Sequence, residues 1–217
     1  RTEDFEPNGL EEWMESLAST QFVKGSQGVN VSEVQTFADI VVKSELSEED
    51  RQNAITTLTR FPLLGSGNIP GTLVFEHELI ADYLAGRYWS RRISRDPEGV
   101  AAALSDRVDF EESVTAHYMA REIAKQEKGI TFLIETLLND SLPGISFTRI
   151  LELLLMADPS SNILSENQIP LEGRHLNHVK FVSRNLNGFS FRNCDISNSL
   201  FDNCSLQKTF FESTRLD

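Results

Sequence analysis

The sequence contains only two cysteines, Cys194 and Cys204, which stand ten residues apart near its end. No Cys-x-x-Cys pair and no cluster of Cys with His accompanies them. Structural zinc sites need several such ligands at short spacings. The sequence therefore predicts no metal site.

Several motifs that identify enzymes are also missing. There is no Gly-x-x-x-x-Gly-Lys-Ser/Thr loop for nucleotide phosphates, and no Gly-x-Ser-x-Gly, His-Glu-x-x-His or Gly-x-Gly-x-x-Gly motif. Adjacent carboxylates such as Glu11-Glu12 and Glu111-Glu112 stand at expected helix starts or on solvated faces. We therefore expect that this chain is not an enzyme and that it holds no cofactor by itself.

Long apolar runs and an excess of positive charge are absent as well. The sequence has no apolar run of about 18 residues and no signal peptide, so we expect a cytoplasmic protein without a membrane segment. The net charge is -13. From Leu171 onward six Lys and Arg stand against five Asp and Glu, so the preceding residues carry -14. Because nucleic acids and anionic membranes attract positive charge, we expect neither as a partner.

The clearest positive pattern lies between Leu171 and Leu216. Every fifth residue there is Leu, Ile or Phe: Leu171, Leu176, Phe181, Leu186, Phe191, Ile196, Phe201, Leu206, Phe211 and Leu216. An α-helix repeats about every 3.6 residues and a β-strand about every 2 residues, so neither explains this spacing. A strict short repeat indicates units that bury their apolar residues by stacking on neighbouring units.

A second register supports the repeat. Two residues before each later apolar residue stands a small one: Cys194, Ser199, Cys204, Thr209 and Thr214. The segment resembles the pentapeptide-repeat family, which implies a right-handed quadrilateral β-helix with one pentad on each face and four pentads in each coil. On that basis Phe191 and Phe211, one coil apart, should stack on each other. The two cysteines should lie on opposite faces as small buried thiols without a disulfide.

Three early residues depart from this family's pattern. Arg174, Arg184 and Phe189 occupy positions where the family prefers small residues. We therefore expect the first coil to be irregular or to be capped by the part of the chain that precedes it.

The chain before the repeat has helical patterns and one hairpin pattern. Helices are predicted at residues 9–20, 32–41, 48–59 and 78–93. Ser32 is an expected N-cap, with Gln35 three residues later as in a capping box. Ser47 is a typical N-cap, because three acidic residues follow it in the first turn. The apolar runs 61–64 and 72–75 flank a Gly-rich turn, which predicts a β-hairpin. The order helix, helix, hairpin, helix predicts a winged helix.

The segment from Phe75 to Tyr88 resembles the winged-helix signature of NACHT and related STAND-type signalling NTPases. It carries that family's Phe-x-His motif, acidic-aromatic pair and small residues: Phe75, His77, Asp82, Tyr83, Ala85 and Gly86. It departs by Asp82 where Glu is usual and by Gly86 where Ala is usual. The resemblance implies that His77 contacts nucleotide phosphates across a domain interface, beside the free amides of a helix start. The alternative is a structural histidine that caps the helix.

Residues 94–167 are expected to form a further helical layer. Asp96 and Pro97 are typical of an N-cap and of the first helical position. The stretch from Phe147 to Met156 is apolar nearly all round, which predicts a buried helix between this layer and the repeat.

Together these patterns predict an α+β protein in three domains. A helical and winged-helix domain covers residues 1–93, a helical linker layer covers 94–167, and a pentapeptide-repeat β-helix covers 168–217. Because the chain starts at Arg1 rather than Met and ends just after a repeat position, we expect a fragment of a longer protein.

The resemblance implies the C-terminal regulatory and sensor part of a NACHT/STAND-type NTPase. An upstream nucleotide-binding domain would be its partner and would bind ATP or ADP. The winged helix would control the nucleotide switch, and the repeat would recognise an unknown protein partner or ligand. Signalling in anti-phage defence is one setting in which such proteins act.

Two other functions are alternatives to this hypothesis. A pentapeptide-repeat scaffold that inhibits a DNA topoisomerase by mimicking DNA would need a long acidic rod, whereas this repeat is short and carries +1. A DNA-binding winged helix would need a basic recognition helix, whereas residues 48–59 carry one cation, Arg51, against three acidic residues. A phosphate-binding loop upstream of Arg1 would decide for the NTPase.

Overall fold

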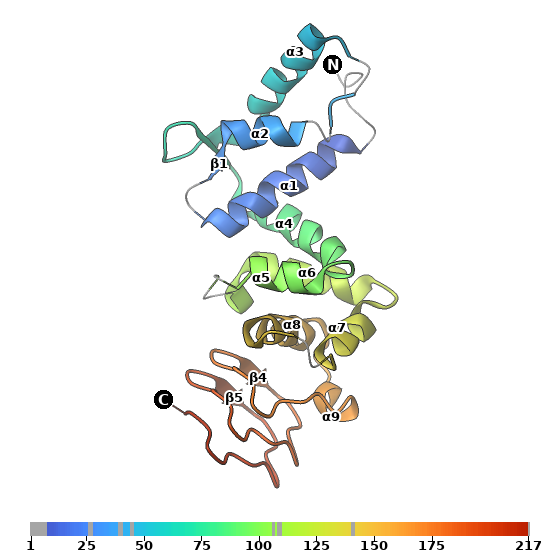
Figure 1. The fold of residues 1–217 in the computed structure, drawn as a ribbon, viewed down its shortest axis with the longest axis vertical. Coiled ribbons are helices and arrows are strands. Elements are labelled where there is room, and N and C mark those ends of the chain that lie inside the picture. The colour runs from blue at the N-terminus through green and yellow to red at the C-terminus, as the bar shows by residue number, and fades with distance from the viewer. Residues whose placement is uncertain are drawn as a thin grey trace. The chain divides into compact units, whose positions relative to one another are not determined.

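A computed structural model describes residues 8–25, 28–38, 41–43, 46–105, 107, 110–139 and 142–216 of the chain. The structure is mainly helical, with 52% of residues in helices and short strands in two small sheets (Figure 1). The chain divides into two compact units, Arg1–Ser90 and Arg91–Asp217, called here the N-terminal and the C-terminal unit.

The N-terminal unit is built around the fully buried side chain of Trp13 on its first helix. The helices of this unit are α1 (Gly9–Lys24), α2 (Val31–Ala38), α3 (Glu48–Thr59) and the part of α4 (Glu78–Ile93) up to Ser90. The indole nitrogen of Trp13 donates to the carbonyl of Val34 at 3.5 Å, and its ring packs edge-on against Phe61 at 5.9 Å. A single large aromatic therefore links α1, α2 and the segment that follows α3.

The predicted hairpin is present and has a third strand. Strand β2 (Leu64–Ser66) pairs antiparallel with β3 (Thr72–Phe75), and β1 (Val29–Asn30) pairs with the other edge of β3. The first hairpin strand begins at Leu64, three residues later than the apolar run that predicted it. The sequence analysis missed β1. Gly28 precedes β1 with a φ of +71°, and a Cβ there would lie 2.7 Å from the carbonyl oxygen of Leu73, so only glycine fits this approach.

Two of the three predicted helix N-caps are confirmed, whereas Ser32 is not an N-cap, because α2 already begins at Val31. The hydroxyl of Ser47 accepts the amide of Asp50 at 3.2 Å at the start of α3. The carboxylate of Asp96 accepts the amide of Gly99 at 2.9 Å at the start of α5 (Pro97–Ala103). These caps satisfy amides that have no partner inside the helix.

The C-terminal unit packs several helices around one buried helix. They are α5, the 3₁₀ turn η3 (Phe110–Glu112), α6 (Val114–Lys125), α7 (Gly129–Leu137), α8 (Gly144–Ala157) and α9 (Ile163–Glu166). Helix α8 contacts α5, α6, α7 and η3, and every residue from Ser146 to Leu155 is buried. The predicted burial of this helix is therefore confirmed. In Figure 1 it lies between α5 and α6 on one side and the C-terminal segment on the other.

The predicted quadrilateral β-helix is wrong. In the part of residues 171–216 that the structure describes, only β4 (Lys180–Val182) and β5 (Leu200–Asp202) are strands, and they form a two-stranded parallel sheet. The remaining pairing consists of isolated parallel bridges, such as His175 with Asp195 and Ser190 with Phe210. No closed or solenoid-like sheet is formed there, so the α+β class with a β-helix is replaced by a mainly helical chain with small sheets.

The backbone explains why the strands are so short. A residue with positive φ occurs at every fifth position from 168 to 213: Gln168, Gly173, His178, Ser183, Gly188, Asn193, Asn198, Asn203, Lys208 and Ser213. Each of these residues leaves the extended region of conformational space and turns the chain. An extended run therefore does not exceed a few residues, and the pairing between runs consists of β4 with β5 and of isolated bridges. We call residues 171–216 the period-five segment.

The period of five still organises the packing of this segment. Phe191 and Phe211 stack at 5.2 Å with an interplanar angle of 4°, which confirms the predicted stack. Phe181 and Phe201 stack in the same way at 5.0 Å, and Phe191 meets Phe201 edge-on at 5.6 Å. Both Phe181 and Phe191 are fully buried. The aromatic rings thus form an inner column that includes stacked and edge-on pairs.

The preceding helices cover the start of the period-five segment, as predicted. Arg174 lies over the ring of Phe147 of α8, with 4.4 Å between its guanidinium carbon and the ring centre. Arg184 is buried and donates to the carbonyl of Leu155 at 2.6 Å. The amide of Asn185 donates to the carbonyl of Ser161 at 2.8 Å. The arginines that depart from the repeat pattern therefore contact the helical part.

Among the helices of the described residues, none is long and apolar enough to cross a membrane.

Candidate functional site

His77 lies directly before α4, where the hairpin strand β3 has just ended. Its carbonyl accepts the amides of Ile80 and Ala81 at 3.0 and 3.2 Å, so its backbone begins the helix. Its side chain is exposed, and the structure shows no hydrogen bond or ion pair of the imidazole to any described residue. The helix start supplies amides without carbonyl partners, and such amides favour an anion.

The other residues of the signature hold this start in place. Phe75 is buried, and its amide donates to the side-chain oxygen of Gln21 of α1 at 2.8 Å. Ala85 and Gly86 are buried within α4, where small residues allow close packing. Tyr83 stays 38% exposed, and Leu79 one turn earlier is 65% exposed. The first two turns of α4 therefore carry apolar side chains that face solvent.

An ion cluster holds α4 to α1 behind this exposed face. Arg87 pairs with Glu11 and, through Nε, with Glu15 at 3.3 Å. Glu15 is 2% exposed, and the guanidinium carbon of Arg87 lies 5.6 Å from the ring centre of Tyr83. Burial alone would lower the pKa of Arg87, but the two carboxylates raise it above its ordinary value. The single positive charge of Arg87 offsets part of the negative charge of the two carboxylates and ties α4 to α1.

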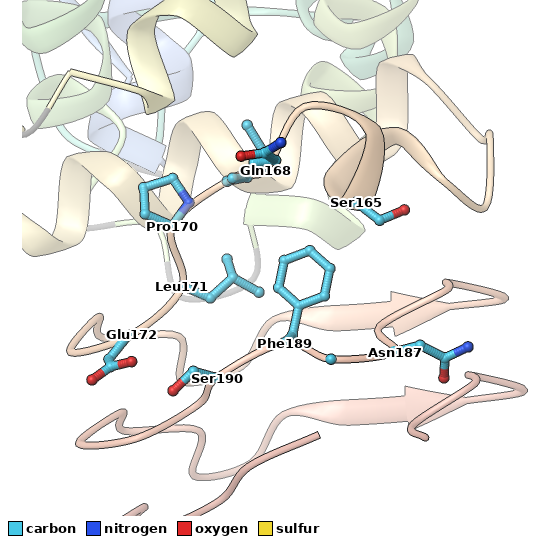
Figure 2. Close-up of a pocket in the computed structure, with 10 residues that line it drawn as sticks. Ser165, Gln168, Pro170, Leu171, Glu172, Asn187, Phe189 and Ser190 are labelled. Carbon is cyan, nitrogen blue, oxygen red and sulfur yellow. The ribbon is translucent and has the colours of Figure 1, made fainter. Parts of the chain in front are cut away.

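A first cavity of about 420 Å³ lies in the C-terminal unit, between the linker after α9 and the period-five segment. Figure 2 shows the ring of Phe189 pointing toward Ser165 at the end of α9 and Gln168 in the linker that follows. Glu172 is the one charged residue among those that line it. Phe189 is the third residue that departs from the repeat pattern, and it shapes this wall. The lining therefore holds a single charge and no cluster of ionisable residues.

A second cavity, of about 290 Å³, lies where η3, α6, α8 and β4 meet, and most of its lining residues are ionisable. They are Glu111, Glu112, His117, Glu152, Lys180 and Arg184, and Leu155, Met156 and Val182 add apolar surface. The ammonium of Lys180 pairs with Glu111 at 2.9 Å and with Glu112 at 2.7 Å. We call this the mixed-charge cavity.

Glu152 is the most perturbed acid of this cavity. Its carboxylate accepts a hydrogen bond from Arg149, one turn earlier on α8, at 2.8 Å, and both side chains are almost fully buried. Burial raises the pKa of Glu152 to about 7, although the positive charge of Arg149 draws it down. Arg149 also donates to the carbonyl of Ser105 at 3.3 Å and lies over the ring of Phe110. A buried acid with a raised pKa beside a cavity is a common feature of functional sites.

The two cysteines take no part in either cavity. Both are free thiols. Cys194 is buried, its Sγ lies 2.9 Å from the carbonyl oxygen of Leu171, and burial raises the pKa of its thiol. No group of three or more His, Cys, Asp or Glu side chains that could hold a metal ion is found among the described residues.

His77 was predicted from the sequence, whereas the mixed-charge cavity was not. Glu111 and Glu112 were placed at helix starts or on solvated faces, and no site role was given to His117 or Lys180. The structure brings all four to one cavity. A signal was present: Arg149 and Glu152 are charged residues in a helix that is otherwise apolar, and such residues are buried only with a partner.

Comparisons with protein-family models, with curated proteins and with solved structures found no match to this chain.

Proposed function

We propose that this chain is a regulatory part of a NACHT/STAND-type signalling NTPase and is not itself catalytic. In this proposal the N-terminal unit controls a nucleotide switch, and the period-five segment recognises a protein partner or ligand. The observation that carries it is the position of His77. The imidazole is exposed at the start of α4, directly after the hairpin, and has no partner among the described residues.

The surface around His77 fits a domain partner. Leu79 is 65% exposed and Tyr83 38% exposed, one turn apart on the same face of α4. Large apolar side chains at neighbouring positions favour burial against another protein surface. An upstream nucleotide-binding domain in the cytoplasm, with ADP or ATP bound, would cover them and bring its phosphates to the helix start.

The period-five segment supports the recognition role through its exposed side chains. Several large apolar residues remain exposed toward its end: Leu200, Leu206, Phe210, Phe211 and Leu216. Arg192 lies over the ring of Phe210, at 5.0 Å from the ring centre, and adds a charge beside this apolar surface. Aromatic residues and arginine are the residue types that contribute most to protein interfaces.

The switch would act through a difference in affinity between two states. A hydrogen bond from His77 to a charged phosphate contributes about 1.5–3 kcal/mol. If this bond exists only in the closed, ADP-bound state, it shifts a two-state equilibrium about tenfold or more. Binding of a partner to the period-five segment would favour the open state by the same linkage.

The test is the ADP affinity of the natural full-length protein that contains this chain. His77→Ala should weaken ADP binding about tenfold or more and raise the basal signalling activity. Gln52→Ala is the control, because Gln52 is also an exposed polar residue of the N-terminal unit but lies on α3, away from the start of α4. An unchanged ADP affinity and unchanged basal activity in His77→Ala would leave His77 a structural residue and remove the main support for the proposal.

A further inference from the structure

The mixed-charge cavity carries its charges in two separate groups. One group belongs to η3 and β4, where two carboxylates, Glu111 and Glu112, share the single ammonium of Lys180. This group therefore has an excess of negative charge. Glu152 adds little to it, because Arg149 holds its carboxylate in a buried ion pair.

The second group is the guanidinium of Arg184, which is 6% exposed and also lines the cavity. It donates to the main-chain carbonyls of Leu155, Asp158 and Ser160, which are neutral acceptors. Its Nε–H has no acceptor. Burial lowers the pKa of Arg184, and the negative charge of Asp158 offsets only part of this effect without a direct ion pair. A buried guanidinium without a direct ion pair is costly, and an anionic ligand would stabilise it.

The size and the apolar wall limit the ligand further. Drug-sized ligands occupy cavities of about 300–1,000 Å³, and this one measures about 290 Å³. Leu155, Met156 and Val182 offer apolar contact. A ligand with only negative charge would be repelled by the glutamates, and one with only positive charge would be repelled by Arg184.

We propose that the mixed-charge cavity binds a small zwitterion of amino-acid size with an apolar side chain. Its carboxylate pairs with Arg184, and its ammonium pairs with Glu111 and Glu112. Its side chain packs on Leu155 and Met156. Such a ligand links η3 and α8 to Arg184 of the period-five segment, so its binding stabilises the contact between the helices and this segment. This site lies within the C-terminal unit and does not depend on the role proposed for His77.

Three probes of similar size separate the charges. Leucine carries both charges, N-acetyl-leucine carries only the carboxylate, and isopentylamine carries only the ammonium. Binding to the chain is measured by NMR titration of backbone amides and of arginine Nε–H signals. Leucine should bind at least about tenfold more tightly than either singly charged probe and should move the signals of Lys180 and Arg184.

Variants test whether binding occurs at this cavity. Glu111→Gln removes one carboxylate at nearly constant size and should weaken leucine binding about tenfold. Glu122→Gln is the matched control, because Glu122 also pairs with a lysine, Lys125, and is similarly buried, but lies outside the cavity. Arg184→Lys should also weaken binding. If that variant does not fold, the Glu111 variant alone decides.

Three outcomes would overturn the proposal. Leucine does not bind at millimolar concentration, or all three probes bind equally well, or Glu111→Gln and Glu122→Gln have the same affinity for leucine. None of these outcomes bears on ADP binding. The proposal of a zwitterion site and the proposed function can therefore be refuted independently of each other.

Discussion

Individual residues with positive φ determine the shape of the period-five segment. Half of the ten positions are glycine or asparagine, the residues that adopt this conformation most readily. The others, such as Lys208, are held there by the stacked packing around them. The turn at every fifth residue is therefore a backbone property, and the apolar residues between the turns follow from it.

Asn198 tests this backbone role, because it is exposed and has a φ of 57°. Asn198→Ala should lower the free energy of unfolding by about 1 kcal/mol, since alanine is strained in the left-handed region. Asn198→Gly should change it by less than about 0.5 kcal/mol, because glycine adopts the same φ without a clash. Chemical denaturation measures both values. Equal stability of the two variants would show that the backbone conformation at this position is not a constraint.

Phe191 tests the aromatic column at the same scale. It is fully buried and contacts Phe181, Phe201 and Phe211. Phe191→Ala should cost about 3–5 kcal/mol, as for other buried aromatic residues. Leu216→Ala should cost far less, because Leu216 is 68% exposed.

Gln207→Ala, at an exposed position of the same segment, is the control and should stay within about 0.5 kcal/mol. Thermal or denaturant unfolding compares the three variants. If Phe191→Ala behaves like Gln207→Ala, then the column contributes no stability and the period of five has no packing role.

At the scale of elements, α8 carries a pH-dependent contribution to stability through Glu152. Burial raises the pKa of Glu152 from 4.5 to about 7 in the folded protein. Between these two values the folded state binds more protons than the unfolded state, so the free energy of unfolding falls as the pH rises. The stabilisation is complete below pH 4.5 and is lost as the pH passes about 7. It amounts to at most about 3 kcal/mol.

Glu152→Gln should remove this part of the pH dependence, because the amide does not titrate and still accepts the hydrogen bond of Arg149. The measurement is the free energy of unfolding of both proteins across the pH range from 4.5 to 7. The pKa of Glu152 also depends on the charges of Arg149, Glu111 and Lys180, and these three residues are unchanged in the variant. Parallel curves for the two proteins would show that Glu152 is ionised throughout.

Local patterns predicted the helical elements well and the pairing of distant segments poorly. The N-caps at Ser47 and Asp96, the hairpin and the buried helix α8 all follow from short-range signals, and all are present. Strand β1 was missed because two residues, Val29 and Asn30, leave no periodic pattern. The β-helix was wrong because the period of five was interpreted through side chains alone, whereas backbone turns end each strand.

The candidate functional residues also differ in whether a local sequence pattern reveals them. His77 was found because it belongs to a contiguous segment with a recognisable order of residue types. The mixed-charge cavity combines residues from positions 111 to 184, and no sequence spacing links Glu111 to Lys180 or Arg184. Only the folded C-terminal unit brings them together.

In the whole molecule, the two proposed roles belong to two different units. The N-terminal unit would sense the nucleotide state through His77, and the C-terminal unit would bind partners or ligands. In this account the chain acts on a nucleotide that another domain binds. We therefore expect that residues 1–217 alone neither bind nor hydrolyse ATP or ADP.

The most direct measurement is the ADP affinity of the natural full-length protein beside that of residues 1–217, determined by calorimetry under the same conditions. We expect tight binding by the full-length protein and no detectable binding by residues 1–217. The proposed switch role of this chain is contradicted if the natural protein does not bind ADP or ATP, or if residues 1–217 bind ADP as tightly as the natural protein does.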